Sequence, residues 1–214
     1  MGEAVVRLRE VAQRFGGRWA FAPVSGEVAQ GGRVWIQGGN GAGKTTVLRL
    51  IAGSLTPTWG EAWAFGVAAG QLTPALRRRV LLVTHAHHLY EGLDVGANLY
   101  AVARLVGHPR VAARRQVAAA VERVGLAAAA ARPVRTFSAG MKRRATLARL
   151  LLTAPDLLLV DEPFAQLDGD GRRLARELLG ERLAAGATLV FTSHQDDGAQ
   201  ALADQIWTLV PAAA

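Results

Sequence analysis

The stretch that decides the fold is Gly38-Gly39-Asn40-Gly41-Ala42-Gly43-Lys44-Thr45-Thr46. It fits the phosphate-binding pattern G-x-x-x-x-G-K-[ST], and it lies between an apolar run at 34–36 and an apolar-periodic run at 45–51. A buried strand, a glycine-rich loop and a helix are therefore predicted in succession. In such a loop the glycines let backbone N–H groups point at phosphate oxygens, and the helix start adds unpaired N–H groups and its dipole.

Two side chains of this loop carry the charge and metal chemistry. Lys44 supplies a point charge for the β- and γ-phosphates of a nucleotide, and the Thr45 hydroxyl is placed for Mg²⁺. Lys44 and Lys142 are the only lysines in a chain with 25 Lys and Arg residues, so lysine stands where a planar guanidinium would be too bulky. The nucleotide-binding residues predicted from this stretch are Gly38, Asn40, Gly41, Ala42, Gly43, Lys44, Thr45 and Thr46.

The composition sets the class of protein. The chain has 214 residues, of which 50% are hydrophobic, and no cysteine, which excludes disulfides and cysteine-based metal sites. The start lacks a signal-peptide core and no apolar run approaches a membrane span, so we expect a cytoplasmic protein that a partner would hold at a membrane.

The net charge of +8 is unevenly distributed. Residues 70–150 hold fourteen of the basic residues and only three acidic ones. Such a segment could dock on nucleic acid, anionic lipid or an acidic partner surface, or it could be a set of solvated helix faces in an arginine-rich chain. We favour the solvated faces over a nucleic-acid partner.

The order of elements predicts an α/β fold of one domain, residues 1–214. Strands are predicted at 4–8, 24–29, 33–37, 62–65, 80–84, 157–161, 188–192 and 205–210, with helices after the loop, at 170–185 and before the last strand. Strands that alternate with helices form a mostly parallel sheet, here with antiparallel strands at the N-terminus. The mostly helical segment 86–155, with an alanine run at 127–131, is predicted to be a lobe between the core segments 1–85 and 156–214.

A second constellation is the apolar strand 157–161, which ends in Asp161-Glu162-Pro163. A strand that is apolar on both faces is buried, and its carboxyl end then lies at the same sheet edge as the phosphate loop. Asp161 can hold Mg²⁺ there, directly or through water. Glu162 is placed to polarise an attacking water molecule.

Two weaker signals gain meaning from their place in the chain. Ser138 and Gly140, in the stretch 137–141, stand before a helix start that could bind an anion, although Ser138 alone could be an ordinary N-cap. His194 follows the strand 188–192 and could contact a γ-phosphate from the sheet edge. The predicted catalytic residues are Glu162, His194 and Lys44.

In this order the motifs resemble those of the ATP-binding cassette family, and the resemblance covers nearly the whole chain. The matching stretches are 38–46, 137–141, 157–162, 165–168 and His194. The resemblance implies ATP hydrolysis with Mg²⁺ and a head-to-tail homodimer, in which each ATP lies between the phosphate loop of one copy and Ser138 and Gly140 of the other. It also implies that Phe15 stacks on adenine, where an aromatic residue is usual, although Phe15 could equally belong to the core.

The chain departs from the family pattern at two places. The stretch 137–141 reads Phe-Ser-Ala-Gly-Met where Leu-Ser-Gly-Gly-Gln is common, which puts the γ-phosphate contacts in doubt. The loop at 85–88 reads His-Ala-His-His where a glutamine should contact Mg²⁺ and the membrane partner. The glutamine position falls at His85 or Ala86, and we favour His85, which would then act on Mg²⁺-bound or attacking water. A metal or haem ligand cluster is the alternative.

The chain has one set of these motifs, no heptad arms between them and a short segment after His194. These features favour a transporter ATPase subunit over the translation-factor and DNA-repair types of the family. Within the family the chain is similar to the ATP-binding subunits of haem exporters in cytochrome c maturation. The resembling stretches are 137–144, 161–171 and 192–195. Integral membrane subunits are the implied partners. The alternatives are another small exporter of drugs, lipids or ions, and a nucleic-acid-associated ATPase.

Overall fold

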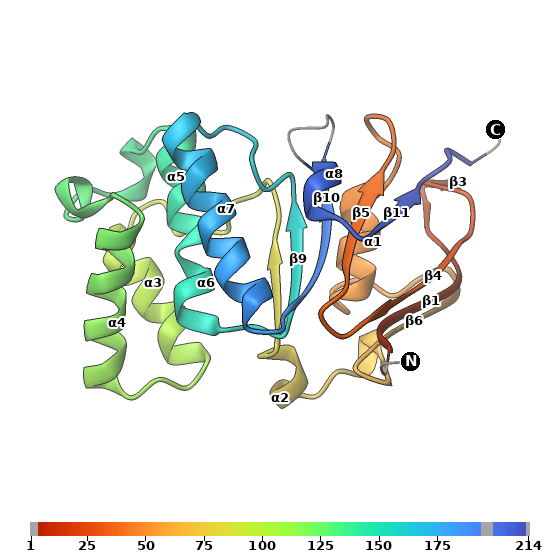
Figure 1. The fold of residues 1–214 in the computed structure, drawn as a ribbon, viewed down its shortest axis with the longest axis horizontal. Helices are drawn as coiled ribbons and strands as arrows, with labels where there is room; N and C mark the ends of the chain where they lie inside the picture. Colours follow the sequence, from red (N-terminus) through yellow and green to blue (C-terminus); the bar gives the residue numbers. More distant parts are fainter. Residues whose placement is uncertain (1–3, 194–198, 213–214) are drawn as a thin grey trace. The chain divides into compact units, whose positions relative to one another are not determined.

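The computed structural model describes residues 4–193 and 199–212 (Figure 1). The chain divides into two compact units. Unit 1 consists of residues 1–84, 156–163 and 185–214, and unit 2 consists of residues 85–155 and 164–184.

Unit 1 contains a parallel sheet and an antiparallel sheet. The parallel sheet has five strands in the order β11-β5-β10-β9-β8, namely β11 (Gln205–Thr208), β5 (Arg33–Gln37), β10 (Thr188–Thr192), β9 (Leu157–Asp161) and β8 (Val80–Val83). The antiparallel sheet has the order β4-β1-β6-β7, namely β4 (Val24–Ala29), β1 (Ala4–Ala12), β6 (Trp59–Ala64) and β7 (Val67–Ala68). The predicted α/β fold with N-terminal antiparallel strands is confirmed.

The rest of unit 1 consists of short connections and one central helix. The small elements are the hairpin β2 (Arg14–Phe15) and β3 (Arg18–Trp19), the helices α2 (Pro74–Arg77) and α8 (Ala199–Leu202), and a 3₁₀ turn at Ala69–Gln71. Helix α1 (Lys44–Ile51) buries Val47, Leu48 and Ile51 in one apolar cluster, which it shares with residues of both sheets. This shared core fixes the helix, and with it the phosphate loop, on the sheet.

The predicted strands 24–29, 33–37, 157–161 and 188–192 have the same bounds in the structure, as β4, β5, β9 and β10. The bounds of β9 and β10 are those predicted, because all five residues of each strand are buried. Strand β6 differs from the predicted 62–65, since it begins at Trp59 and ends at Ala64. Phe65 (φ 53°) and Gly66 (φ 73°) form the two-residue turn into β7, a geometry that matches the twist of a hairpin.

Unit 2 is helical. It contains α3 (Val95–Leu105), α4 (Arg110–Arg123), α5 (Ala139–Leu147), α6 (Arg149–Thr153) and α7 (Gly169–Ala184), with 3₁₀ turns at Ala127–Ala129 and Val134–Thr136. The alanine run therefore forms a short 3₁₀ turn. Helix α7 groups with unit 2 because it packs against α5 and α6, whereas the sequence places residues 164–184 in the core. Among the described residues no helix has the length and apolar content that a membrane crossing requires.

Helix α1 ends in a motif that requires glycine. The N–H of Gly53 donates to the Leu50 carbonyl at 3.1 Å, and the N–H of Ser54 donates to the Arg49 carbonyl at 3.0 Å. This is the Schellman arrangement, with Gly53 left-handed at φ +66°. A Cβ on Gly53 would lie 1.9 Å from the carbonyl oxygen of Ala69, which is backbone and cannot rotate away.

We predict that Gly53→Ala destabilises the fold more than Gly66→Ala. Both residues have similar positive φ, but a Cβ on Gly66 meets nothing within 4 Å. Gly66→Ala should therefore cost only the left-handed strain, about 1–2 kcal/mol. Gly53→Ala should add an overpacking cost of about 1–3 kcal/mol.

Urea unfolding of the two variants and the wild type measures this difference. Equal free energies of unfolding for the two variants would show that the carbonyl of Ala69 moves away without cost.

Candidate functional site

The phosphate loop joins β5 to α1 and is shaped by two left-handed glycines. Gly41 has φ +76° and Gly43 has φ +88°, and Gly43 occupies the N-cap position of α1. Within the described residues, no side chain caps this helix and no acidic residue lies in its first turn. The positive end of the helix is therefore not neutralised from its own first turn, which favours binding of an anion.

Phe21 explains why position 43 admits only glycine. A Cβ on Gly43 would lie 2.4 Å from Cδ1 of Phe21, and the Phe21 side chain is completely buried. The aromatic ring thus packs directly against the backbone at the helix start. The sequence pattern shows the glycine but not this buried neighbour.

Lys44 lies inside the loop. Its Nζ donates to the carbonyl oxygens of Gly38 at 2.8 Å and Gly39 at 2.9 Å, and the residue is 6% exposed. Burial lowers the pKa of Lys44, while the nearby carboxylates of Glu162 and Asp161 act in the opposite direction. The ammonium group is thus held at the loop, close to two acidic residues.

Asp161 connects three elements of unit 1. The hydroxyl of Thr45, at the start of α1, donates to Oδ2 of Asp161 at 2.7 Å. The hydroxyl of Thr192, at the end of β10, donates to Oδ1 at 2.6 Å. Thr192 is the register partner of Asp161 in the parallel pair β9–β10, so both strand ends meet at one sheet edge. This role of Thr192 is not visible in the sequence.

Glu162 follows directly and has a strained backbone. Its φ is +50°, which is uncommon for a residue with a side chain. Its N–H donates to the hydroxyl of Thr192 at 3.0 Å and to the Thr192 carbonyl at 3.2 Å. These two bonds stabilise the left-handed conformation. Strain of this kind persists where the surroundings enforce it, which is often at functional sites.

These residues surround one pocket. It has a volume of about 370 Å³ and is lined by Asn40, Gly41, Ala42, Gly43, Lys44, Thr45, Thr46, Asp161 and Glu162. The structure therefore brings together most of the predicted nucleotide and Mg²⁺ residues of unit 1. The oxygen atoms of Thr45 and Asp161 are hard ligands of the kind that Mg²⁺ prefers, so the residues present fit this ion.

Among the described residues of unit 1, Gly38 and Phe15 are predicted to bind the nucleotide but do not line this pocket. Phe15 lies in the β2–β3 hairpin and is 52% exposed, so the alternative of a core residue is wrong and the adenine contact stays a prediction. His194 lies outside the described residues.

The predicted anion site of unit 2 is the start of α5. Ser138 is the N-cap residue, and its hydroxyl accepts the Met141 N–H at 3.2 Å. A Cβ on Gly140 would lie 3.2 Å from the carbonyl oxygen of Gln166, so glycine permits the close approach of this neighbouring segment. Ser138 thus serves as an N-cap, and its phosphate contact stays a prediction.

The histidine loop also belongs to unit 2. Nδ1 of His87 lies 3.5 Å from the hydroxyl of Thr146, and burial together with the positive charges of Arg143 and Lys142 lowers the pKa of His87. In the described part of the chain, no group of three or more His, Cys, Asp or Glu side chains is arranged to hold a metal ion. The action of His85 on Mg²⁺-bound water stays a prediction.

Residues 21–165 match the family model described as ABC transporter. The chain is 36% identical over 205 residues to the cytochrome c biogenesis ATP-binding export protein CcmA of Paramagnetospirillum magneticum, with 94% of both chains covered. It is 35% identical over 203 residues to the Nod factor export ATP-binding protein I of Cupriavidus pinatubonensis, covering 95% of this chain. The chain spans only 62% of the length of that Nod factor protein.

Solved structures agree with these relatives. An ATP-binding subunit of an ABC transporter superposes with a TM-score of 0.86 at 25% identity, over 96% of this chain and 86% of that chain. A second solved structure is a dimeric ATP-binding cassette in a post-hydrolysis state, bound to ADP and Pi. It superposes with a TM-score of 0.84 at 22% identity, over 96% of this chain and 94% of that chain. At this identity the likeness supports the fold alone. The chain therefore belongs to the ABC transporter family.

Proposed function

We propose that this chain binds and hydrolyses ATP to power a membrane transporter. The observation that carries the proposal is the network in which Asp161 accepts hydrogen bonds from Thr45 and Thr192, beside Glu162 and the phosphate loop. The network supports the proposal because the lining of one pocket includes Asp161, a carboxylate suited to a metal ion, Glu162, a carboxylate suited to a base, and the start of α1, which is suited to an anion. This combination is what phosphoryl transfer to water requires.

The roles of the residues follow from their chemistry. The N–H groups at the start of α1 and the ammonium of Lys44 would hold the β- and γ-phosphates. Thr45 and Asp161 would hold Mg²⁺, which supplies charge neutralisation on the phosphate oxygens when it is bound. Glu162 would accept the proton of the attacking water, with its backbone held by Thr192. Phe15 would stack on adenine, and His194 would contact the γ-phosphate.

The proposed enzyme acts with a second copy of the chain and with membrane subunits. In the ATP-bound homodimer, Ser138 and Gly140 would contact the nucleotide held by the second copy. Integral membrane subunits would hold the protein at the cytoplasmic face of the membrane.

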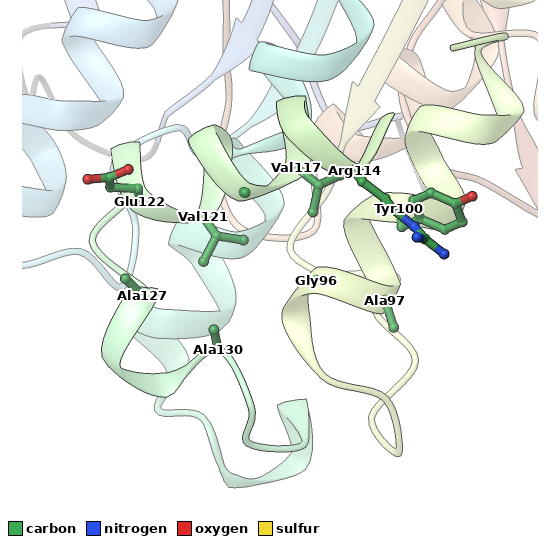
Figure 2. Close-up of a pocket in the computed structure, with 10 residues that line it drawn as sticks. Gly96, Ala97, Tyr100, Arg114, Val117, Val121, Glu122, Ala127 and Ala130 are labelled. Carbon is green, nitrogen blue, oxygen red and sulfur yellow. The ribbon is translucent and has the colours of Figure 1, made fainter. Parts of the chain in front are cut away.

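A pocket of unit 2 is a candidate surface for a membrane subunit. It has a volume of about 580 Å³ between helices α3 and α4 and the turn at 127–129. Figure 2 shows Glu122 at one end, Arg114 towards the other, and the apolar Val117 and Val121 between them. Apolar side chains of a partner would fill such a groove, and its two charges would orient the partner through charged groups of opposite sign.

The proposal also concerns the transported substrate. CcmA relatives and Nod factor export relatives match at similar identity, 34–36% and 32–35%. We propose haem export in cytochrome c maturation, because the CcmA protein of P. magneticum is covered over 94% of its length. A drug exporter is the alternative, since the daunorubicin/doxorubicin resistance ATP-binding protein of Streptomyces peucetius is 36% identical over 171 residues.

We predict that Glu162→Gln keeps ATP binding and loses most turnover, by about 10²- to 10⁴-fold, because it removes the proton acceptor and leaves the phosphate loop intact. Lys44→Ala should instead weaken nucleotide binding, since Lys44 is the one lysine of the loop. Steady-state ATPase rates and ATP affinities of the two variants separate these effects. A Glu162→Gln protein that turns over at the wild-type rate would remove Glu162 from the role of base.

The role of His85 can be tested by substitution. If His85 replaces the missing glutamine, its imidazole would orient the attacking or Mg²⁺-bound water. His85→Ala should then lower the ATPase rate and change its dependence on Mg²⁺. His87→Ala is the matched control, because Nδ1 of His87 lies 3.5 Å from the hydroxyl of Thr146 in unit 2. Wild-type rates and an unchanged Mg²⁺ dependence in His85→Ala would eliminate a functional role for His85.

We predict that deletion of the gene abolishes covalent attachment of haem to cytochrome c and leaves other transport intact. The protein should also co-purify with small polytopic membrane proteins. Haem staining of membrane and periplasmic fractions from the deletion strain provides the measurement, with re-expression of the wild type and of Glu162→Gln as controls. Normal holocytochrome c in the deletion strain would rule out haem export but not the ATPase activity.

A further inference from the structure

Helix α5 carries Ser138 and Gly140 at its start and an arginine one turn further on. Nη2 of Arg144 donates to both oxygens of Asp168, at 2.8 Å to Oδ1 and 2.9 Å to Oδ2. Asp168 belongs to the segment that precedes α7, so the ion pair joins two segments of unit 2 that are 24 residues apart. Hydrogen bonds between charged groups are about twice as strong as those between neutral groups.

Asp168 is itself held in place. Its Oδ1 accepts the N–H of Gly171 at 2.7 Å in the first turn of α7. The Gly171 N–H, followed by the hydrogen bond from Arg144, holds the pKa of Asp168 below its usual value. The carboxylate therefore stays ionised, with one oxygen bound to α7 and both bound to α5.

A second contact between the two segments lies at Gly140. The carbonyl of Gln166 approaches so closely that a Cβ on Gly140 would lie 3.2 Å away, and Gln166 has a left-handed φ of +62°. Gly140 and Arg144 are four residues apart on α5, a rise of about 6 Å along one face. The segment 166–168 thus contacts α5 at two successive turns of the same face.

We propose that Arg144 is a positioning residue, which through Asp168 fixes the start of α5 against the segment 166–168. The inference rests on the proposed function, in which Ser138 and Gly140 contact the nucleotide of the second copy. Without the Arg144–Asp168 pair, the segment 166–168 would still contact α5 at Gly140 but would not be bonded to the next turn of the helix. Ser138 would then be positioned less rigidly.

The test is a double-mutant cycle of Arg144→Gln and Asp168→Asn. The amide oxygen that Asp168→Asn introduces can still accept the Gly171 N–H, so this variant removes the charge partner and keeps the cap of α7. Each single variant should lower kcat about tenfold with little change in KM for ATP, and the double variant should be no worse than either single one. Arg144→Lys keeps the positive charge but replaces the planar guanidinium with a single ammonium group, and should recover part of the rate.

The matched control is Arg123→Gln. Arg123 also forms ion pairs within unit 2, with Glu181 at 2.8 Å and Glu177 at 3.5 Å, but these join α4 to α7. Loss of this pair removes a similar amount of charge without touching α5, so kcat should stay at the wild-type value.

Hydrogen exchange of the isolated chain gives a measurement that does not depend on hydrolysis. Amides at 138–141 and 168–171 should exchange faster in Arg144→Gln than in the wild type, and at the wild-type rate in Arg123→Gln. Unchanged exchange, an additive cycle, or a wild-type kcat in Arg144→Gln would each overturn the inference. A wild type that hydrolyses no ATP would instead contradict the proposed function, and the exchange data would still decide whether Arg144 positions α5.

Discussion

Unit 1 depends on the hydrogen bonds that converge on the carboxylate of Asp161. One oxygen accepts from Thr45 and the other from Thr192, so both are satisfied although the residue is only 3% exposed. A buried carboxylate without such donors would cost considerable free energy. The bonds tie the start of α1, the end of β9 and the end of β10 to one point. The phosphate loop and the catalytic carboxylate proposed above are thereby held on the same sheet edge.

The backbone conformations of Gly43 and Glu162 also position the residues at this sheet edge. The left-handed Gly43 allows the chain to turn from the loop into α1 while the ring of Phe21 packs against it. Glu162 adopts a left-handed conformation directly after the end of β9, and Thr192 holds its backbone N–H there. The apolar cluster of α1 and the two sheets supplies the rigidity that such strained residues need.

In unit 2 basic side chains form ion pairs that connect helices to other helices or to neighbouring segments. Helix α5 is joined through Lys142 to Glu91 at 2.6 Å and through Arg144 to Asp168, while Arg123 joins α4 to α7. The strongly basic segment 70–150 is therefore partly neutralised by Asp168 and Glu181, which lie outside the segment in the sequence. Part of the excess charge remains available for a partner, for which the groove beside Arg114 and Glu122 is a candidate.

The sequence by itself determined the phosphate loop, the bounds of β9 and β10, the order of the motifs and hence the family. These features are local, because a glycine pattern or a short apolar run encodes its own conformation. Tertiary structure alone decided the roles of Thr192, Phe21 and Arg144, the exposure of Phe15, and the place of α7. Each depends on strand register or on the packing of segments far apart in the chain, and no local pattern contains that information.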